Sequence, residues 1–178
     1  METAPDHFII LKLNKLEKQT IRPAAEVYDV CAQLCSVAVQ FEDAWERKDI
    51  EFDTDLEDAA YTQADPGLLE LVWTNLLSNA VKFTEAGGTL SLTLEAQEDL
   101  AVVRVGDTGC GIPEEYRTSV FQPFFRVDKS RSREYGGAGL GLSLVWEIAD
   151  LHGGSVRVAE SSKQGTTIAV ELPALSYS

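Results

Sequence analysis

Two asparagines and a lysine recur at helical spacing between residues 66 and 84. Asn75, Asn79 and Lys82 are four and three residues apart, so a helix would present all three side chains on one face. Asparagine is a poor helix former because its amide competes for backbone hydrogen bonds, and two in one helix indicate a function that offsets this cost. An amide oxygen can bind Mg²⁺, and a lysine can contact a phosphate. The alternative is a solvated helix face that carries two amides by chance.

A second group of candidate residues directly follows a predicted strand. Residues 106–113 read GDTGCGIP, and glycines at such a place let the chain turn sharply and let a ligand contact the backbone. Asp107 stands at the strand end, where a carboxylate in an apolar pocket can accept the exocyclic amine proton of adenine and so select adenine over guanine. The alternative is an ordinary turn.

The third group is a basic segment in an otherwise acidic chain. Residues 124–136 read FFRVDKSRSREYG and include Arg126, Lys129, Arg131 and Arg133. Glycines flank the segment, which favours a lid that closes over a polyphosphate, with arginine supplying forked donors. A solvated charged loop is the alternative.

The fourth group is a glycine run, GGAGLGL at 136–142, which opens a predicted helix. Free N–H groups and the positive dipole end at a helix start can bind phosphate. The residues just before the run, Arg133, Glu134 and Tyr135, do not form an apolar strand, so a Rossmann dinucleotide-binding motif is excluded. The chain also lacks the GxxxxGK[ST] motif of P-loop enzymes.

The elements that must position these groups follow from apolar periodicity and capping residues. The pattern predicts helices from after Pro23 to about Lys48, from Asp65 and Pro66 to about Thr84, and over 140–152, with a further short amphipathic helix around residues 9–16. Strands are predicted at 50–56, 90–94, 101–105, 155–158 and 166–172, the last four as two hairpins. This order predicts an α+β fold: a two-layer sandwich in which a mixed, mostly antiparallel sheet carries helices on one face.

Composition excludes several classes of protein. Fifteen Lys and Arg against 29 Asp and Glu give a net charge of −14, which argues against nucleic-acid binding. No apolar run has the length of a membrane span, and the N-terminus does not resemble a signal peptide. Cys31, Cys35 and Cys110 lack zinc-ligand spacing and cannot all pair with one another, which favours a reducing, cytoplasmic compartment.

Taken in order, the two-asparagine helix, the DxGxG loop, the FQPFFR segment and the GxGLGL helix resemble the N, G1, F and G2 boxes of sensor histidine kinases. The resemblance spans about residues 65–172 and includes the LHGG turn and the final hairpin. It implies the catalytic ATP-binding domain, with the Bergerat fold shared with gyrase, Hsp90 and MutL. The implied cofactors are ATP and Mg²⁺.

The resemblance also implies roles for individual residues. Asn79 would be the Mg²⁺ ligand, Asn75 and Lys82 would lie near the phosphates, and Asp107 would bind the adenine amine. Arg126 would reach the terminal phosphate, so that Asn75, Asn79 and Arg126 form the catalytic set. The remaining residues implied in cofactor binding are Gly109, Gly111 and Ile112 at the adenine pocket, Phe121 with Phe124 as anchors of the lid, and Gly137, Gly139, Leu140 and Gly141 beside the triphosphate.

Two features depart from the family pattern. Leu71 stands four residues before Asn75, where many members carry Glu or Gln, and this puts an acid-assisted step in doubt. The chain also lacks a phosphoacceptor motif: His7 matches nothing, and His152 matches the HGG turn, where a helix-end role is expected. Residues 1–22 resemble the end of a dimerisation helix or a linker, and residues 23–178 the catalytic domain, so the chain resembles a part of a longer, membrane-bound, dimeric sensor kinase.

The leading hypothesis is transfer of the ATP γ-phosphoryl group to a histidine on a separate dimerisation domain, from which a response regulator would receive it. Protein-histidine kinase activity would then need that second domain. Two alternatives remain: an ATP-sensing binding module without transfer, and an ATPase of the gyrase, Hsp90 or MutL kind. The short lid, the LHGG ending and Leu71 argue against the ATPase.

Overall fold

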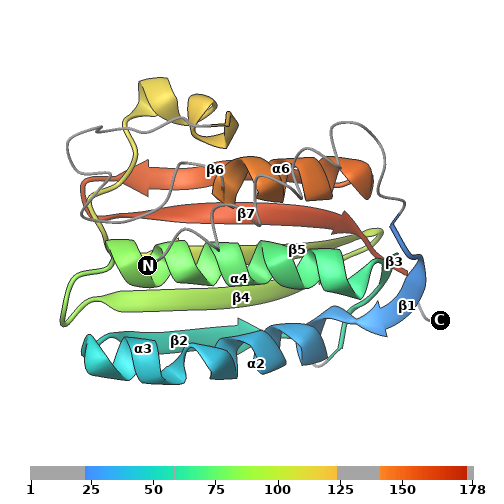
Figure 1. Ribbon diagram of the computed structural model, residues 1–178, viewed down its shortest axis with the longest axis horizontal. Coiled ribbons are helices and arrows are strands. Elements are labelled where there is room, and N and C mark those ends of the chain that lie inside the picture. Colours follow the sequence, from blue (N-terminus) through green and yellow to red (C-terminus); the bar gives the residue numbers. More distant parts are fainter. Residues whose placement is uncertain (1–22, 58, 124–140, 176–178) are drawn as a thin grey trace, which may run out of the picture.

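A five-stranded sheet and a layer of helices make up the part of the chain that the computed structural model describes, residues 23–57, 59–123 and 141–175. Figure 1 shows α2, α4 and α6 side by side on one face of this sheet. In chain order the elements are β1 (Glu26–Asp29), α2 (Val30–Gln40), α3 (Glu42–Arg47), β2 (Glu51–Leu56), β3 (Tyr61–Ala64), α4 (Pro66–Phe83), β4 (Thr89–Gln97), β5 (Leu100–Asp107), the 3-10 helices η1 (Glu114–Tyr116) and η2 (Ser119–Phe121), α6 (Gly141–Leu151), β6 (Ser155–Ser162) and β7 (Gly165–Pro173).

The sheet has the strand order β2-β4-β5-β7-β6. β2 is parallel to β4, and the other neighbours are antiparallel. A parallel pair needs a crossover connection, and the segment that contains α4 supplies it. The predicted fold class, a two-layer sandwich with a mixed, mostly antiparallel sheet, is therefore confirmed.

α4 is the central helix of the core. Its apolar side chains recur at helical spacing, and seven are buried: Leu68, Leu69, Val72, Trp73, Leu76, Leu77 and Ala80. They pack against the inner side of β4 and β5, which presents alternate apolar residues. Polar contacts fix α2 beside α4, since Gln33 accepts a hydrogen bond from the Trp73 indole N–H (2.8 Å) and donates one to the Pro66 carbonyl (2.7 Å).

The start of α4 matches the sequence prediction. Asp65 is the N-cap, and its Oδ1 accepts a hydrogen bond from the Leu68 N–H at 3.1 Å, while Pro66 occupies the first helical turn. The other carboxylate oxygen accepts from the Ala24 N–H at 2.9 Å. Partial burial acts to raise the pKa of Asp65, but hydrogen bonds from the backbone of Ala24, Leu68 and Gly67 outweigh it and hold that pKa below its ordinary value.

The single helix predicted from Pro23 to Lys48 is wrong. Residues 26–29 form β1, which pairs with β3, a strand that was not predicted. Asp29 then caps α2, because its side chain accepts from the Cys31 N–H, and the same oxygen accepts from the Ala60 N–H at 3.1 Å. The helix α2 ends before Phe41, and α3 begins after it.

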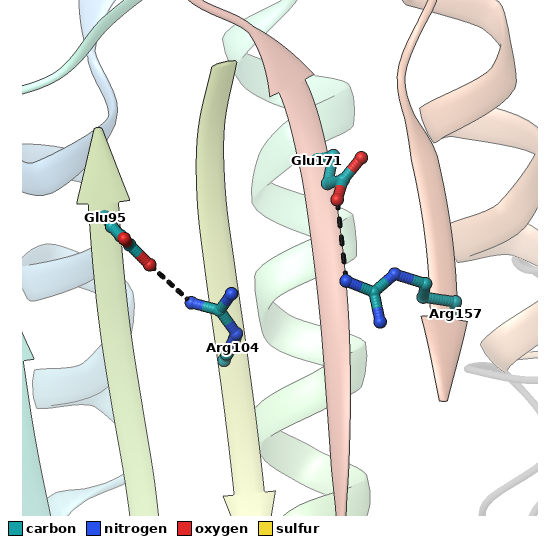
Figure 2. A network of polar contacts seen from close by, with 4 residues as sticks. All are labelled: Glu95, Arg104, Arg157 and Glu171. Atoms are coloured by element: carbon teal, nitrogen blue, oxygen red, sulfur yellow. Dashed lines mark hydrogen bonds and ion pairs between the residues drawn. The ribbon is translucent and has the colours of Figure 1, made fainter. Parts of the chain in front are cut away.

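The face of the sheet away from the helices carries a ladder of charges (Figure 2). Arg104 on β5 contacts Glu95 on β4 at 2.9 Å, and Arg157 on β6 contacts Glu171 on β7 at 3.6 Å. These four residues are the cross-strand partners of Val102 and Ala169, which are buried outside the main core. Long arginine side chains can cover apolar surface while their charges stay hydrated, so the ladder covers two small residues on the open face.

No helix among the described residues is long and apolar enough to cross a membrane.

We expect Asp65→Ala to lower the free energy of unfolding by about 0.5 to 2 kcal/mol at neutral pH, because α4 loses its cap. The pKa of Asp65 is lowered in the folded state, so its contribution is present at neutral pH and is lost as the pH falls through that lowered pKa. Denaturant titrations of both proteins should therefore converge in acid. Asp55→Ala, at an exposed residue of β2, is the control, and equal stability of Asp65→Ala and the natural chain at pH 7 would contradict the capping role.

Candidate functional site

The face of α4 opposite the core carries the three polar residues singled out in the sequence. Asn75 and Asn79 are half-buried and Lys82 is exposed, whereas Leu76, Leu77 and Ala80 between them are buried. The predicted division of the helix into an apolar and a polar face is confirmed. Within the described residues, neither the Asn79 amide nor the Lys82 ammonium forms a hydrogen bond through its side chain.

Asn75 brings the polar face of α4 into contact with the start of α6. Its Nδ2 donates to the Leu71 carbonyl at 2.7 Å, which orients the amide. Its Oδ1 lies 3.0 Å from the place that a Cβ on Gly141 would take. Glycine at this first residue of α6 therefore lets the helix begin close against Asn75, and two motifs 66 residues apart in the sequence meet here.

Asp107 ends β5 with its carboxylate half-buried. Oδ1 accepts a hydrogen bond from the Gly109 N–H at 2.8 Å. Burial raises the pKa of Asp107 above its ordinary value, although hydrogen bonds from the backbone of Gly109 and Thr166 act in the opposite direction. A carboxylate held in this way retains acceptor capacity for a ligand.

The loop after Asp107 packs against the end of α4. A Cβ on Gly109 would lie 2.5 Å from the Phe83 carbonyl oxygen, so only glycine permits this approach. Thr108 Oγ1 accepts a hydrogen bond from the Thr89 N–H at 3.0 Å, which ties the loop to the start of β4. The two predicted motifs, the polar helix and the DxGxG loop, thus meet at the C-terminal end of α4.

The far side of the same loop packs against the hairpin of β6 and β7. Gly111 has a φ of +82°, and a Cβ on it would collide with the Ser162 carbonyl oxygen. The Ile112 N–H donates to Ser161 Oγ at 2.6 Å. The requirement for glycine at 109 and 111 therefore has two separate causes, one at α4 and one at the hairpin.

Three residues were not predicted from the sequence: Ser161, which contacts the loop, and its hydrogen-bond partners Arg117 and Thr166. Ser161 lies 49 residues from Ile112 and 44 from Arg117, whose Nη2 donates to its carbonyl. No local motif marks these residues, because their importance arises only when β6 and β7 fold back beside the loop.

The other predicted site residues are distributed as follows. Phe121, at the end of η2, is partly buried and packs against the core. Phe124, Arg126, Gly137, Gly139, Leu140 and His7 lie outside the described residues.

His152 has the structural role that was predicted. Its Nδ1 is 2.7 Å from the Ile148 carbonyl, which can only accept, so Nδ1 carries the proton. Its Nε2 accepts from the Asp65 N–H at 3.2 Å. Both ring nitrogens are therefore used in joining the end of α6 to the start of α4.

Comparison with known proteins identifies the family. Residues 64–176 match the sequence profile of the family described as histidine kinase-, DNA gyrase B- and HSP90-like ATPases. Among curated relatives, the circadian input-output histidine kinase CikA of Synechococcus elongatus is 46% identical over 111 residues, which cover 62% of this chain and 15% of CikA. The sensor histidine kinase RppB of Synechocystis is 32% identical over 171 residues, 94% of this chain and 37% of RppB.

Solved structures give the same result. Full-length ShkA in complex with AMPPNP has a TM-score of 0.83 at 28% identity, covering 97% of this chain and 37% of ShkA. A nucleotide-free catalytic domain of the histidine kinase ThkA has a TM-score of 0.75 at 28% identity, covering 84% of this chain and 95% of that domain.

The chain thus spans well under half the length of the two curated relatives. Its sequence and fold agree with the ATP-binding catalytic domains of sensor histidine kinases. The chain therefore belongs to the family of histidine kinase-, DNA gyrase B- and HSP90-like ATPases.

Proposed function

We propose that the chain binds Mg²⁺·ATP between the polar face of α4, the loop at 108–113 and the start of α6, and transfers the γ-phosphoryl group to a histidine on a separate dimerisation domain. The observation that carries this proposal is the meeting of α4 with Gly141 at one place and with Gly109 at another. Phosphoryl transfer depends mainly on positioning and on charge stabilisation, and this arrangement offers fixed polar groups for both.

In the proposed site, Asp107 accepts a hydrogen bond from the adenine amine, and Gly109, Gly111 and Ile112 shape the adenine pocket. Asn75, Lys82 and Arg126 act on the phosphates, with Gly137, Gly139, Leu140 and Gly141 beside them. Phe121 anchors the lid. AMPPNP, the nucleotide in the ShkA complex, is an ATP analogue, which supports an adenine nucleotide as the ligand.

Asn79 is the proposed metal ligand. Its half-buried amide has no side-chain hydrogen bond with another described residue, so its oxygen is available to a hard cation. Mg²⁺ would supply charge neutralisation on the phosphates, whose oxygens would complete its coordination. Lys82, three residues further on the same face and equally without a side-chain partner in the described part, would add a positive charge for the phosphates.

Leu71 supports transfer over hydrolysis. In this chain the position holds an apolar side chain that packs against the core, and its carbonyl accepts from Asn75. No carboxylate is therefore available at residue 71 to activate water, as an ATPase of the gyrase, Hsp90 or MutL kind would require.

The partners belong to the same proposal. Residues 1–22 would end a dimerisation helix whose histidine accepts the phosphoryl group, and residues 23–178 would be the catalytic domain. A response regulator would then receive the group. The relatives are named as sensor histidine kinases and are longer than this chain, which supports a catalytic domain within a longer sensor. A cytoplasmic position of this domain in a membrane-bound sensor is part of the same proposal.

Asp107→Ala should weaken ATP binding about tenfold to hundredfold, the usual cost of losing a hydrogen bond to a charged group. The ionised carboxylate is the stronger acceptor for the adenine amine, and the pKa of Asp107 is raised, so the affinity of the natural chain should fall at a higher pH than an ordinary aspartate would give. The variant should lack this acid-dependent loss, while the titration of ATP itself affects both proteins. Calorimetric titrations at several pH values, with Asp99→Ala at an exposed turn as the control, measure this. An unchanged ATP affinity in Asp107→Ala would refute the adenine assignment.

Asn79→Ala should weaken binding of Mg²⁺·ATP more than binding of metal-free ATP, because the amide is assigned to the metal. Asn75→Ala is the matched comparison on the same face, and its loss should be the same with and without Mg²⁺. The ratio of the two affinities, measured for each variant by calorimetry, decides the assignment. Equal losses for Asn79→Ala in both conditions would assign it a structural role.

The chain alone should bind ATP without becoming stably phosphorylated, because an acceptor imidazole must approach in line to roughly 3 to 3.5 Å from the γ-phosphate. Both nitrogens of His152 are engaged at the α6–α4 junction, so it is not available. With labelled ATP, addition of the parent protein's histidine-bearing dimerisation domain should produce acid-labile label on that domain. Binding without transfer would instead indicate an ATP-sensing module, and rapid phosphate release an ATPase. Acid-labile label on the chain alone, lost in His7→Ala or His152→Ala, would contradict the proposal.

A further inference from the structure

Ser161, near the end of β6, makes polar contacts with the loop at 108–113 and with the residues around it. Its Oγ accepts the Ile112 N–H at 2.6 Å and lies 3.0 Å from Thr166 Oγ1. Its carbonyl accepts from Arg117 Nη2 at 2.6 Å. One residue of the hairpin therefore forms hydrogen bonds both with the loop and with Arg117, which follows η1.

The hairpin also contacts the loop through the backbone. Gly111 lies so close to the Ser162 carbonyl that a Cβ would not fit, and Gly165 lies equally close to the Asp107 carbonyl. Gly111, within the loop, and Asp107, just before it, thus contact the same hairpin, so the conformation of the loop depends on the positions of β6 and β7.

The contacts of Ser161 lead directly to the carboxylate of Asp107. The backbone of Thr166 hydrogen-bonds that carboxylate, and the hydroxyl of Thr166 pairs with Ser161 Oγ. A substitution at Ser161 would therefore remove a hydrogen bond to Ile112 and, through Thr166, alter the surroundings of the Asp107 carboxylate.

Arg117 contributes a charged donor to the same carbonyl. Its side chain is half-buried, and hydrogen bonds from charged groups are stronger than those between neutral groups. Arg117 follows η1, so its bond fixes the chain just beyond the loop, as Asp107 fixes it just before.

We propose that Ser161 and Arg117 are positioning residues for nucleotide binding, which hold the loop at 108–113 in the conformation that adenine requires before the base arrives. This inference rests on the proposed function. A loop that is ordered in advance loses little conformational entropy when the ligand binds. Loss of this order would therefore reduce the affinity for the ligand.

The test is nucleotide affinity in Ser161→Ala, which removes the acceptor of the Ile112 N–H. The affinity for ATP should fall about threefold to tenfold, as expected for one neutral hydrogen bond. Adenosine should lose the same factor, because the contact acts on the base and not on the phosphates. Ser161→Thr keeps an Oγ at the same place and should restore binding. Ser155→Ala, at an exposed position at the start of β6, is the matched control and should bind as the natural chain does.

Amide spectra provide a readout that loss of stability alone would not produce. In the nucleotide-free protein, the Ile112 amide signal should shift in Ser161→Ala and return toward its natural position in Ser161→Thr. Arg117→Met retains the side-chain stem and should also weaken ATP and adenosine binding, which keeps the proposal testable if Ser161→Ala does not fold. Natural affinity for both ligands in Ser161→Ala or in Arg117→Met would overturn it. Failure of the natural chain to bind ATP at all would instead overturn the proposed function.

Discussion

The rotation of α4 about its own axis is the constraint on which the rest of the site depends. Seven buried side chains fix that rotation against the sheet, and the Trp73–Gln33 hydrogen bond fixes it against α2. Successive residues of a helix point in set directions, so burial of the apolar face also decides where Asn75, Asn79 and Lys82 point. The direction in which these polar side chains point thus follows from the tight packing of the core on the opposite face of α4.

The loop after Asp107 is positioned differently, by close backbone contacts and polar bonds to three neighbouring segments. α4, the start of β4 and the β6–β7 hairpin each contact a different residue of the loop. Burial of the Asp107 carboxylate carries a cost for the folded protein, which its raised pKa records, and the backbone bonds offset only part of it. A ligand that donates a hydrogen bond to this carboxylate would offset more of that cost. Burial of the carboxylate thus lowers the stability of the ligand-free protein but favours ligand binding.

Local features of the sequence predicted most of the fold. The Asp65–Pro66 start of α4, the hairpin turn near residue 98 and the glycines after α6 act within a few residues, so their patterns are legible. β1 and β3 were missed because they are short and pair with each other across more than thirty intervening residues. Val27 lies four residues before Cys31 and therefore fits a helical pattern of apolar residues, but the helix begins only at Val30.

The same distinction applies to the site. Asn75, Asn79, Asp107 and the glycines of the loop could be predicted as candidate site residues because each motif is contiguous, and the structure adds the contacts between the motifs. Arg117, Ser161 and Thr166 could not be recognised, because the bonds that make them relevant join residues far apart in the chain. A pattern within one element indicates its faces, whereas a contact between elements depends on the whole fold.

The position of β2 at one edge of the sheet bears on how copies of the protein meet one another. An edge strand exposes unpaired backbone groups, which can pair with the edge of another chain. Glu51, Asp53 and Asp55 alternate along β2 and are all exposed. Two copies that approached through this edge would bring like charges together in a protein that already carries a net charge of −14. The acidic strand therefore disfavours sheet extension between molecules and helps to keep the protein from aggregating.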